Sequence, residues 1–179
     1  LTLALTVWPA LASDTKEDAQ ALSHYILGVY REDLGDLDRA IKEYQLALEA
    51  DPASALLHLN LASIFIKQNN ADLAIAQLKQ AIGFTPEAVE PHAILALVYA
   101  AQNKAELSNQ EYTLALKNAV KLEPKNIEIY KSLGAIYLQQ KKLKEAEGIF
   151  KLIAGMDPAD PQAHFYLANI YYDLKDYSS

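Results

Sequence analysis

Apolar residues recur along most of the chain at intervals of three and four positions, and polar stretches separate these runs. Ala40, Tyr44 and Ala47 form one such set. The spacing follows the helical turn of about 3.6 residues, so it places the apolar side chains on one face of a helix. Ala, Leu, Lys, Glu and Gln, which all favour helices, dominate the composition. The pattern therefore predicts an all-α fold.

Four prolines mark an internal repeat. Pro52, Pro86, Pro124 and Pro158 are separated by 34, 38 and 34 residues, and each closes a similar phrase: LEADP, GFTP, KLEP and AGMDP. A proline cannot continue a helix and favours an extended conformation at the residue before it, so each phrase ends one unit. After a polar lead-in at residues 13–20, the units are residues 21–54, 55–88, 89–126, 127–160 and a partial unit, 161–179.

Small and aromatic residues stand at fixed places in these units. The eighth position is small throughout: Gly28, Ala62, Ala96, Gly134 and Ala168. The eleventh is aromatic in four units: Phe65, Tyr99, Tyr137 and Tyr171. These positions resemble those of the tetratricopeptide repeat, a helix–turn–helix unit of about 34 residues. The resemblance covers residues 21–179 and implies a right-handed α-solenoid of stacked helix pairs.

The small residues have a packing explanation that is independent of the resemblance. A residue without a large side chain lets two paired helices approach closely where they cross. Glycine inside a helix costs about 0.5–1 kcal/mol relative to alanine, so a glycine kept there indicates a close approach. Gly28 and Gly134 are therefore predicted to lie at helix crossings.

The third unit is four residues longer than its neighbours. Ser108, Tyr112 and Ala115 match the small–aromatic–small set of the second helix without any shift, so the insertion follows them, within residues 117–120. These residues continue the helical pattern. We therefore expect the second helix of this unit to be one turn longer than the others.

The resemblance also implies a binding surface, because first helices of the family line a concave groove. The corresponding positions here are largely apolar or aromatic, which is typical of an interaction site for a protein or peptide. An equally open alternative is that this strip packs on another part of the same, longer protein. The predicted groove residues are Tyr25, Val29, Leu59, Ser63, Ile66, Lys67, Leu97, Lys131, Leu138, Phe165, Asn169 and Tyr172.

The chaperone-binding members of the family hold a terminal carboxylate with lysine, asparagine and arginine. Tyr25 and Val29, and then Ala93 and Leu97, stand where those residues are expected. The sequence therefore favours an apolar helix or extended segment over a carboxylate-clamped ligand.

No residues form a recognisable catalytic or metal-binding motif. The chain has no cysteine, no phosphate-binding glycine loop and no His-Glu-x-x-His sequence. The four histidines all occupy the fourth position of a unit, which indicates a packing role: His24, His58, His92 and His164. We expect a non-catalytic protein without a metal or cofactor.

The net charge of −7 is unevenly distributed. Residues 1–90 hold 13 acidic and 6 basic side chains, whereas residues 91–179 hold 10 of each. Neither half has the basic surface that nucleic-acid binding requires. Lys141, Lys142 and Lys144 form the only dense basic patch, which we interpret as a solvated helix start.

The first twelve residues, LTLALTVWPALA, are apolar and uncharged. They are too short to span a bilayer, which needs about 20 residues, and resemble the end of a signal peptide with cleavage after Ala12. This predicts an exported protein of the bacterial cell envelope, periplasmic or secreted, with no membrane span in the mature chain. Without a signal the chain would be cytoplasmic. The tail of a membrane anchor and the last helix of an upstream repeat are the alternatives.

The sequence thus predicts a non-catalytic protein–protein interaction scaffold. Two other functions remain open: the recruitment arm of a larger enzyme that continues beyond Ser179, and a structural solenoid that self-assembles. Apolar residues fall on nearly every side of the last predicted helix, residues 162–174. We therefore expect a longer array, or a homo-oligomer that covers this open repeat.

Overall fold

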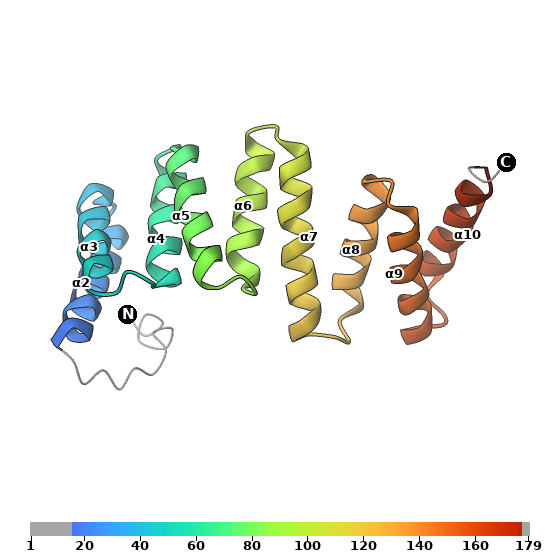
Figure 1. The fold of residues 1–179 in the computed structure, drawn as a ribbon, viewed down its shortest axis with the longest axis horizontal. Coiled ribbons are helices and arrows are strands. Elements are labelled where there is room, and N and C mark those ends of the chain that lie inside the picture. Colours follow the sequence, from blue (N-terminus) through green and yellow to red (C-terminus); the bar gives the residue numbers. More distant parts are fainter. Residues whose placement is uncertain (1–15, 177–179) are drawn as a thin grey trace. The chain divides into compact units, whose positions relative to one another are not determined.

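The computed structural model describes residues 16–176, and side chains from Asp18 to Leu174. This part of the chain is helical and contains no strand (Figure 1). The helices are α2 (Lys16–Asp33), α3 (Leu37–Ala50), α4 (Ala55–Lys67), α5 (Ala71–Phe84), α6 (Val89–Ala101), α7 (Ala105–Leu122), α8 (Ile127–Gln139), α9 (Leu143–Met156) and α10 (Pro161–Asp176). The predicted all-α repeat fold is confirmed.

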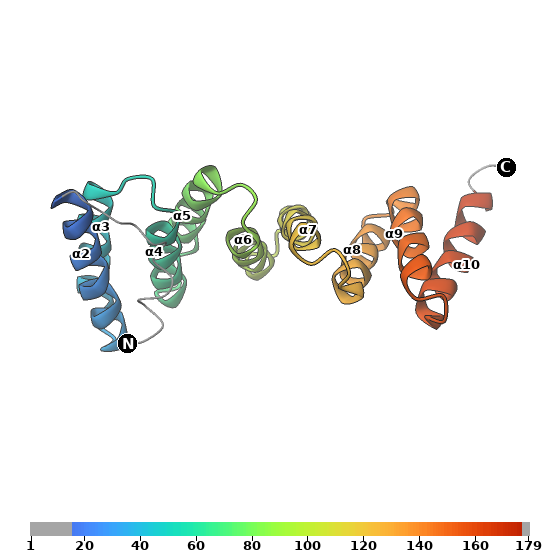
Figure 2. The ribbon, with the colours of Figure 1, turned by 90° about the horizontal axis from the view of Figure 1, so that it is seen from below.

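The helices form two compact units, one ending at Glu87 and the other beginning at Ala88. In the first unit α2 pairs with α3 and α4 pairs with α5, and α3 also contacts α4. In the second unit α6 pairs with α7 and α8 with α9, while α7 contacts α8 and α9 contacts α10. Within each unit, consecutive helices lie side by side in both ribbon views (Figures 1 and 2).

The turn inside each helix pair has the same backbone geometry. One residue adopts a left-handed conformation, with φ between 57° and 75°: Gly35, Asn69, Asn103 and Lys141. The amide of the next residue then donates to a carbonyl five residues back: Asp36 to Arg31, Asn70 to Phe65, Lys104 to Tyr99 and Lys142 to Tyr137. This Schellman arrangement satisfies a carbonyl at the helix end and reverses the chain direction.

The glycines at the eighth position lie at tight helix crossings, as predicted. A Cβ atom at Gly28 would lie 2.4 Å from Tyr44 Cε1, and one at Gly134 would lie 2.8 Å from Phe150 Cζ. Neither ring leaves room for a methyl group at the glycine. The glycines therefore let α2 approach α3 and let α8 approach α9.

Each unit has its own apolar core, built from the repeat positions. The core of the first unit consists of Tyr25, Ala40, Tyr44, Ala47, Leu57, Leu61, Ile64, Phe65 and Ala74. The core of the second consists of Leu116, Tyr130, Leu133, Ile136, Tyr137, Ala146, Phe150, Ile153, Ala163 and Ile170. Because neighbouring repeats contribute to both clusters, stacking of helix pairs buries the apolar faces.

Helix α7 has 18 residues, whereas α3, α5 and α9 have 14 each. The extra residues are the insertion located within residues 117–120, so the predicted additional turn is confirmed. The longer helix ends at Leu122, whose side chain is exposed.

Residues 1–12, on which the export prediction rests, lie outside the described residues. Among the helices of residues 16–176, none is long and apolar enough to cross a membrane.

Candidate functional site

Histidines at the fourth position connect the two helices of a pair. In three of the repeats the histidine Nδ1 atom lies 2.7 Å from a side-chain oxygen 19 residues further along the chain: His24 with Glu43, His58 with Gln77, and His92 with Glu111. In the fourth repeat Tyr130 takes the place of the histidine, and its hydroxyl donates to the Pro124 carbonyl at 3.0 Å. Within residues 16–176 no three metal-ligating side chains come together. These histidines are packing residues, as their periodic placement indicates.

Tyr25 belongs to the core of the first unit. Its side chain is 5% exposed, and its ring centroid lies 6.2 Å from that of Tyr44. Burial raises the pKa of the Tyr25 hydroxyl, which also hydrogen-bonds with the Asn60 side chain. This predicted groove residue therefore joins α2 to α3 and α4 and has almost no surface left for a ligand.

Lys67, another predicted groove residue, takes part in a network across three helices. Its Nζ donates to Glu32 Oε1 at 2.7 Å, and Glu32 Oε2 accepts from the Tyr44 hydroxyl at 2.9 Å. Burial, followed by the Glu32 carboxylate, raises the pKa of Tyr44. The network ties α4 to α2 and α3, which gives Lys67 a structural role.

The remaining predicted positions of the first unit lie at or near the surface. Val29, Leu59 and Ser63 are half-buried, and the Ile66 side chain is exposed. They offer scattered surface, whereas an open pocket lies in the second unit.

The predicted groove residues of the second unit include three of its four most exposed large apolar side chains. Leu97 on α6 is 71% exposed, Phe165 on α10 is 62% exposed and Tyr172 on α10 is 70% exposed. Phe165, Asn169 and Tyr172 follow one another at spacings of four and three, so they share one face of α10. Asn169 is exposed and Leu138 on α8 is half-buried.

Lys131 connects α8 to the start of α10. Its Nζ lies 2.8 Å from Asp160 Oδ2 and 3.3 Å from Glu128 Oε1. Asp160 is 5% exposed, and its Oδ1 accepts from the backbone amides of Gln162 and Ala163. Lys131 lowers the pKa of the Asp160 carboxyl, with help from these amides, and Asp160 raises the pKa of Lys131. This ion pair fixes the carboxylate that caps α10.

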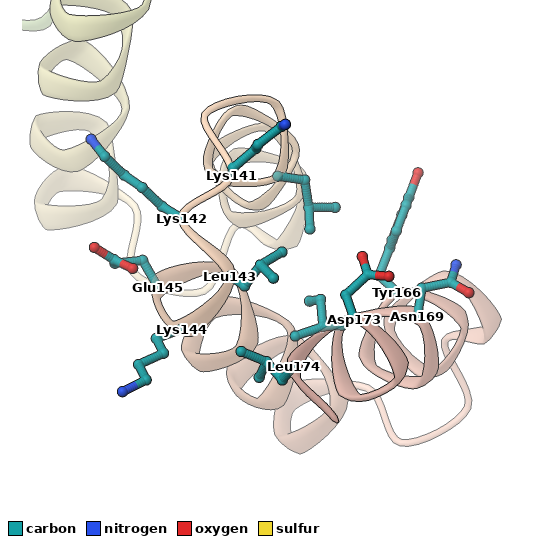
Figure 3. Close-up of a pocket in the computed structure, with 11 residues that line it drawn as sticks. Lys141, Lys142, Leu143, Lys144, Glu145, Tyr166, Asn169, Asp173 and Leu174 are labelled. Atoms are coloured by element: carbon teal, nitrogen blue, oxygen red, sulfur yellow. The ribbon is translucent and has the colours of Figure 1, made fainter. Parts of the chain in front are cut away.

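An open pocket of about 970 Å³ lies where α8 ends, α9 begins and α10 crosses them (Figure 3). Leu138, on α8, and Asn169, on α10, are the predicted groove residues that line it. Its other apolar lining residues are Leu143, Tyr166, Ile170 and Leu174. These four were not among the predicted groove residues, although the apolar residues on nearly every side of α10 were a signal for Tyr166, Ile170 and Leu174. Leu143, at the start of α9, had no such signal.

The rim of the pocket is charged. Lys141, Lys142 and Lys144 come from the turn and the first residues of α9, together with Glu145, and Asp173 comes from α10. None of the three lysines forms an ion pair with another described residue. The amino groups of Lys142 and Lys144 point away from α10 (Figure 3). Such a pocket can hold apolar side chains and present cations to groups beside them.

Sequence models of one family match three segments of the chain. A "TPR repeat" model matches residues 32–69, and two "Tetratricopeptide repeat" models match residues 55–87 and 114–164. Together these segments cover more than half of the chain. No curated protein sequence matches it significantly.

Several solved structures share the fold. YrrB, described as a protein with an unusual peptide-binding site, is 20% identical, with a TM-score of 0.57 over 90% of this chain and 80% of its own. PilF of Pseudomonas aeruginosa is 23% identical, with a TM-score of 0.54 over 92% of this chain and 73% of its own. The second TPR of Spaghetti (RPAP3), bound to an HSP90 peptide, is 27% identical, with a TM-score of 0.51 over 54% of this chain and 90% of its own.

The similarity to these structures is consistent with the paired helices, with the small residues at the helix crossings and with the three segments that the sequence models match. The chain belongs to the tetratricopeptide repeat family.

Proposed function

We propose that the chain is a non-catalytic scaffold whose second unit binds an apolar peptide or helix along α8 and α10. The repeat fold and the family support the general part of this function, a protein-interaction scaffold. The specific part of the proposal, a binding surface on α8 and α10, rests on the geometry of the second unit.

The exposed aromatic face of α10 beside the pocket carries the proposal. Phe165 and Tyr172 are both mostly exposed, one turn either side of the pocket residue Asn169. Large aromatic side chains provide much contact area for little loss of conformational entropy, and they are enriched at the centres of interfaces. A helix that presents two of them next to a pocket lined by Leu138 and Leu143 has the composition of a binding site.

Two of the similar structures provide an analogy. YrrB has a peptide-binding site, and the RPAP3 domain is bound to an HSP90 peptide. The present chain differs from the carboxylate-clamping members, because Tyr25 and Val29 replace the polar residues and Tyr25 is buried. We therefore infer that apolar side chains, rather than a terminal carboxylate, anchor the partner.

The test uses fluorescent twelve-residue peptides with Leu, Ile, Phe or Met at the variable apolar positions and Gln elsewhere, measured as a pool by fluorescence anisotropy. Phe165→Ser with Tyr172→Ser should weaken binding at least tenfold, because truncating two aromatic anchors removes about 1–2 kcal/mol each. The matched control is Tyr112→Ser with Leu152→Ser, which removes two partly exposed side chains from second helices.

Circular dichroism separates binding from folding in this test. Equal binding by the two double variants would contradict the proposed surface. Loss of helix in the Phe165/Tyr172 variant alone would mean that these residues support the fold rather than a ligand.

We further propose that the protein is exported, because the apolar segment that ends in Ala10-Leu11-Ala12 resembles the end of a signal peptide. Amino-terminal sequencing of the protein purified from its native cells should give Ser13 as the first residue. Retention of residues 1–12 on a cytosolic protein would contradict this proposal.

A further inference from the structure

The turn that borders the pocket differs from the equivalent turns of the first three helix pairs. Gly35, Asn69 and Asn103 hold the left-handed position in those turns, and Lys141 holds it here with φ 57°. Glycine and asparagine adopt this conformation readily, whereas it costs other L-residues about 1–2 kcal/mol. Lys141 is therefore an unfavourable choice for the turn itself.

The residues that follow it are also unfavourable for starting a helix. Lys142 is the N-cap of α9 and makes no side-chain cap hydrogen bond, as is also true of Lys104 before α7, whereas Asn70 before α5 accepts from the amide of Leu73. Two residues further on, Lys144 stands where α3 and α5 have Asp38 and Asp72.

A positive side chain at a helix amino terminus opposes the helix dipole, which favours anions there. Glu145, in the first turn of α9, offsets this in part. None of the three lysines forms an ion pair with a described residue, but the charge of Lys144 interacts with the Glu147 carboxylate, which pairs with Lys151. Lys141 at the left-handed position and Lys144 in the first turn of α9 are two departures from the residues of the other turns, and they indicate a function outside the fold.

The lining of the pocket indicates which chemistry that function requires. Five of the eleven lining residues are apolar, and the rim carries three lysines against the two acidic residues Glu145 and Asp173, which leaves the rim net positive. A purely apolar segment would leave the lysines without partners. Carboxylates beside apolar anchors would complement them.

We propose that the pocket binds a protein segment that carries internal Asp or Glu residues beside its apolar anchors. The apolar side chains lie on Leu138, Leu143 and Tyr166, which are half-buried, and the carboxylates pair with the lysines. This inference rests on the proposed binding function of the α8–α10 face and adds the charge of the partner.

The test compares three pools of the twelve-residue peptides, amidated at the carboxyl end, with Glu, Gln or Lys at the positions between the apolar residues. The Glu pool should bind about tenfold more tightly than the Gln pool at low salt, because several exposed ion pairs each contribute modestly. The preference should shrink as salt is raised. The Lys pool should bind most weakly.

The decisive variant is Lys141→Gln with Lys142→Gln and Lys144→Gln. It should bind the Glu and Gln pools equally, so that the ratio of their two dissociation constants falls from about ten to about one. The matched control is Lys104→Gln with Lys117→Gln and Lys125→Gln, which has the same net charge but alters lysines that do not line the pocket. It should keep the preference for the Glu pool.

Each result separates the two proposals. Equal binding of the Glu and Gln pools by the original protein would overturn the acidic partner and leave the proposed binding function intact. Failure to bind any pool would overturn both. A labelled twelve-nucleotide DNA that binds more tightly than the Glu pool, and loses its binding in the pocket-lysine variant, would show that the lysines serve a nucleic acid instead.

Discussion

Gly28 lies where α2 crosses α3, opposite the ring of Tyr44. A Cβ atom at Gly28 would lie 2.4 Å from Tyr44 Cε1, and Tyr44 is fully buried, so its ring has no space into which to move. Gly83, inside α5, has no atom within 4 Å of the equivalent Cβ position. The same substitution at these two glycines therefore separates close packing from helix propensity.

Gly28→Ala should destabilise the protein by about 1–3 kcal/mol, because the new methyl group overpacks the crossing. Gly83→Ala should stabilise it by about 0.5–1 kcal/mol, because alanine loses less conformational entropy in a helix. Urea denaturation of both variants measures the difference. Stabilisation of both to the same extent would mean that the helices do not approach closely at Gly28.

Asp160 makes the stability of the second unit depend on pH. Lys131 lowers the pKa of its carboxyl in the folded protein. At pH values above the ordinary carboxyl pKa of about 3.9, the folded and unfolded chains are both ionised and the ion pair contributes fully. As the pH falls through the lower, folded pKa, this contribution is lost.

Asp160→Asn keeps an oxygen that can cap α10 and removes only the charge. It should therefore lower the melting temperature at neutral pH, and the difference from the original protein should close at acid pH below the folded pKa. Differential scanning calorimetry across this range tests the assignment. A difference that stays constant with pH would exclude the ion pair as its cause.

The repeat positions predicted the packing residues correctly but not all of the surface residues. Gly28, Gly134 and the histidines could be placed because each recurs in phase with the prolines. Tyr25 and Lys67 could not be placed in this way, because their partners Asn60 and Glu32 come from a neighbouring repeat. The position of a residue within one repeat does not reveal which side chain of the next repeat will contact it.

Among the helices and turns, the helix bounds follow the repeat closely. The turn before α9 differs from the other turns in its side chains, because a lysine holds the left-handed position. Its backbone hydrogen bond matches those of the other turns, with Lys142 donating to the Tyr137 carbonyl at 2.8 Å. The side chains rather than the backbone depart from the repeat. The sequence showed the lysines as a basic patch, but only the structure showed that they border the pocket.

Lys141→Asn with Lys142→Asn, which introduces the turn residues found at Asn69 and Asn70, should stabilise the protein by about 1–2 kcal/mol. Gly35→Lys should destabilise it by about 1 kcal/mol for the opposite reason. Thermal melts of both variants test the argument. Changes in the same direction would mean that the left-handed position does not govern the stability of these turns.

At the scale of the whole molecule, each unit buries its own core from neighbouring repeats, and α10 keeps an exposed aromatic face. The family resemblance predicted the repeat architecture, and it placed Leu138 and Asn169 on what proved to be the pocket wall. It did not predict the pocket itself, because Leu143 and Tyr166 lie outside the positions that the resemblance assigns to the groove. The pocket is formed where α8, α9 and α10 pack together, and the spacing of residues within one helix does not reveal how three helices pack.

The exposed α10 face also bears on self-association, the structural alternative left open by the sequence. If a second copy covers this face, Phe165→Ser with Tyr172→Ser should reduce association, because the two most exposed aromatics of α10 are lost. Sedimentation velocity over a concentration series measures the effect. A monomer at every concentration in the original protein would exclude self-assembly through this helix.

Hydrogen–deuterium exchange with and without the Glu peptide pool locates the binding surface along the chain. We expect slower exchange in the segments that line the pocket, at the end of α8, the start of α9 and along α10, and unchanged exchange in α3 and α5. Slower exchange confined to α3, α5 or α7, with α8 and α10 unaffected, would contradict the binding surface proposed for this protein.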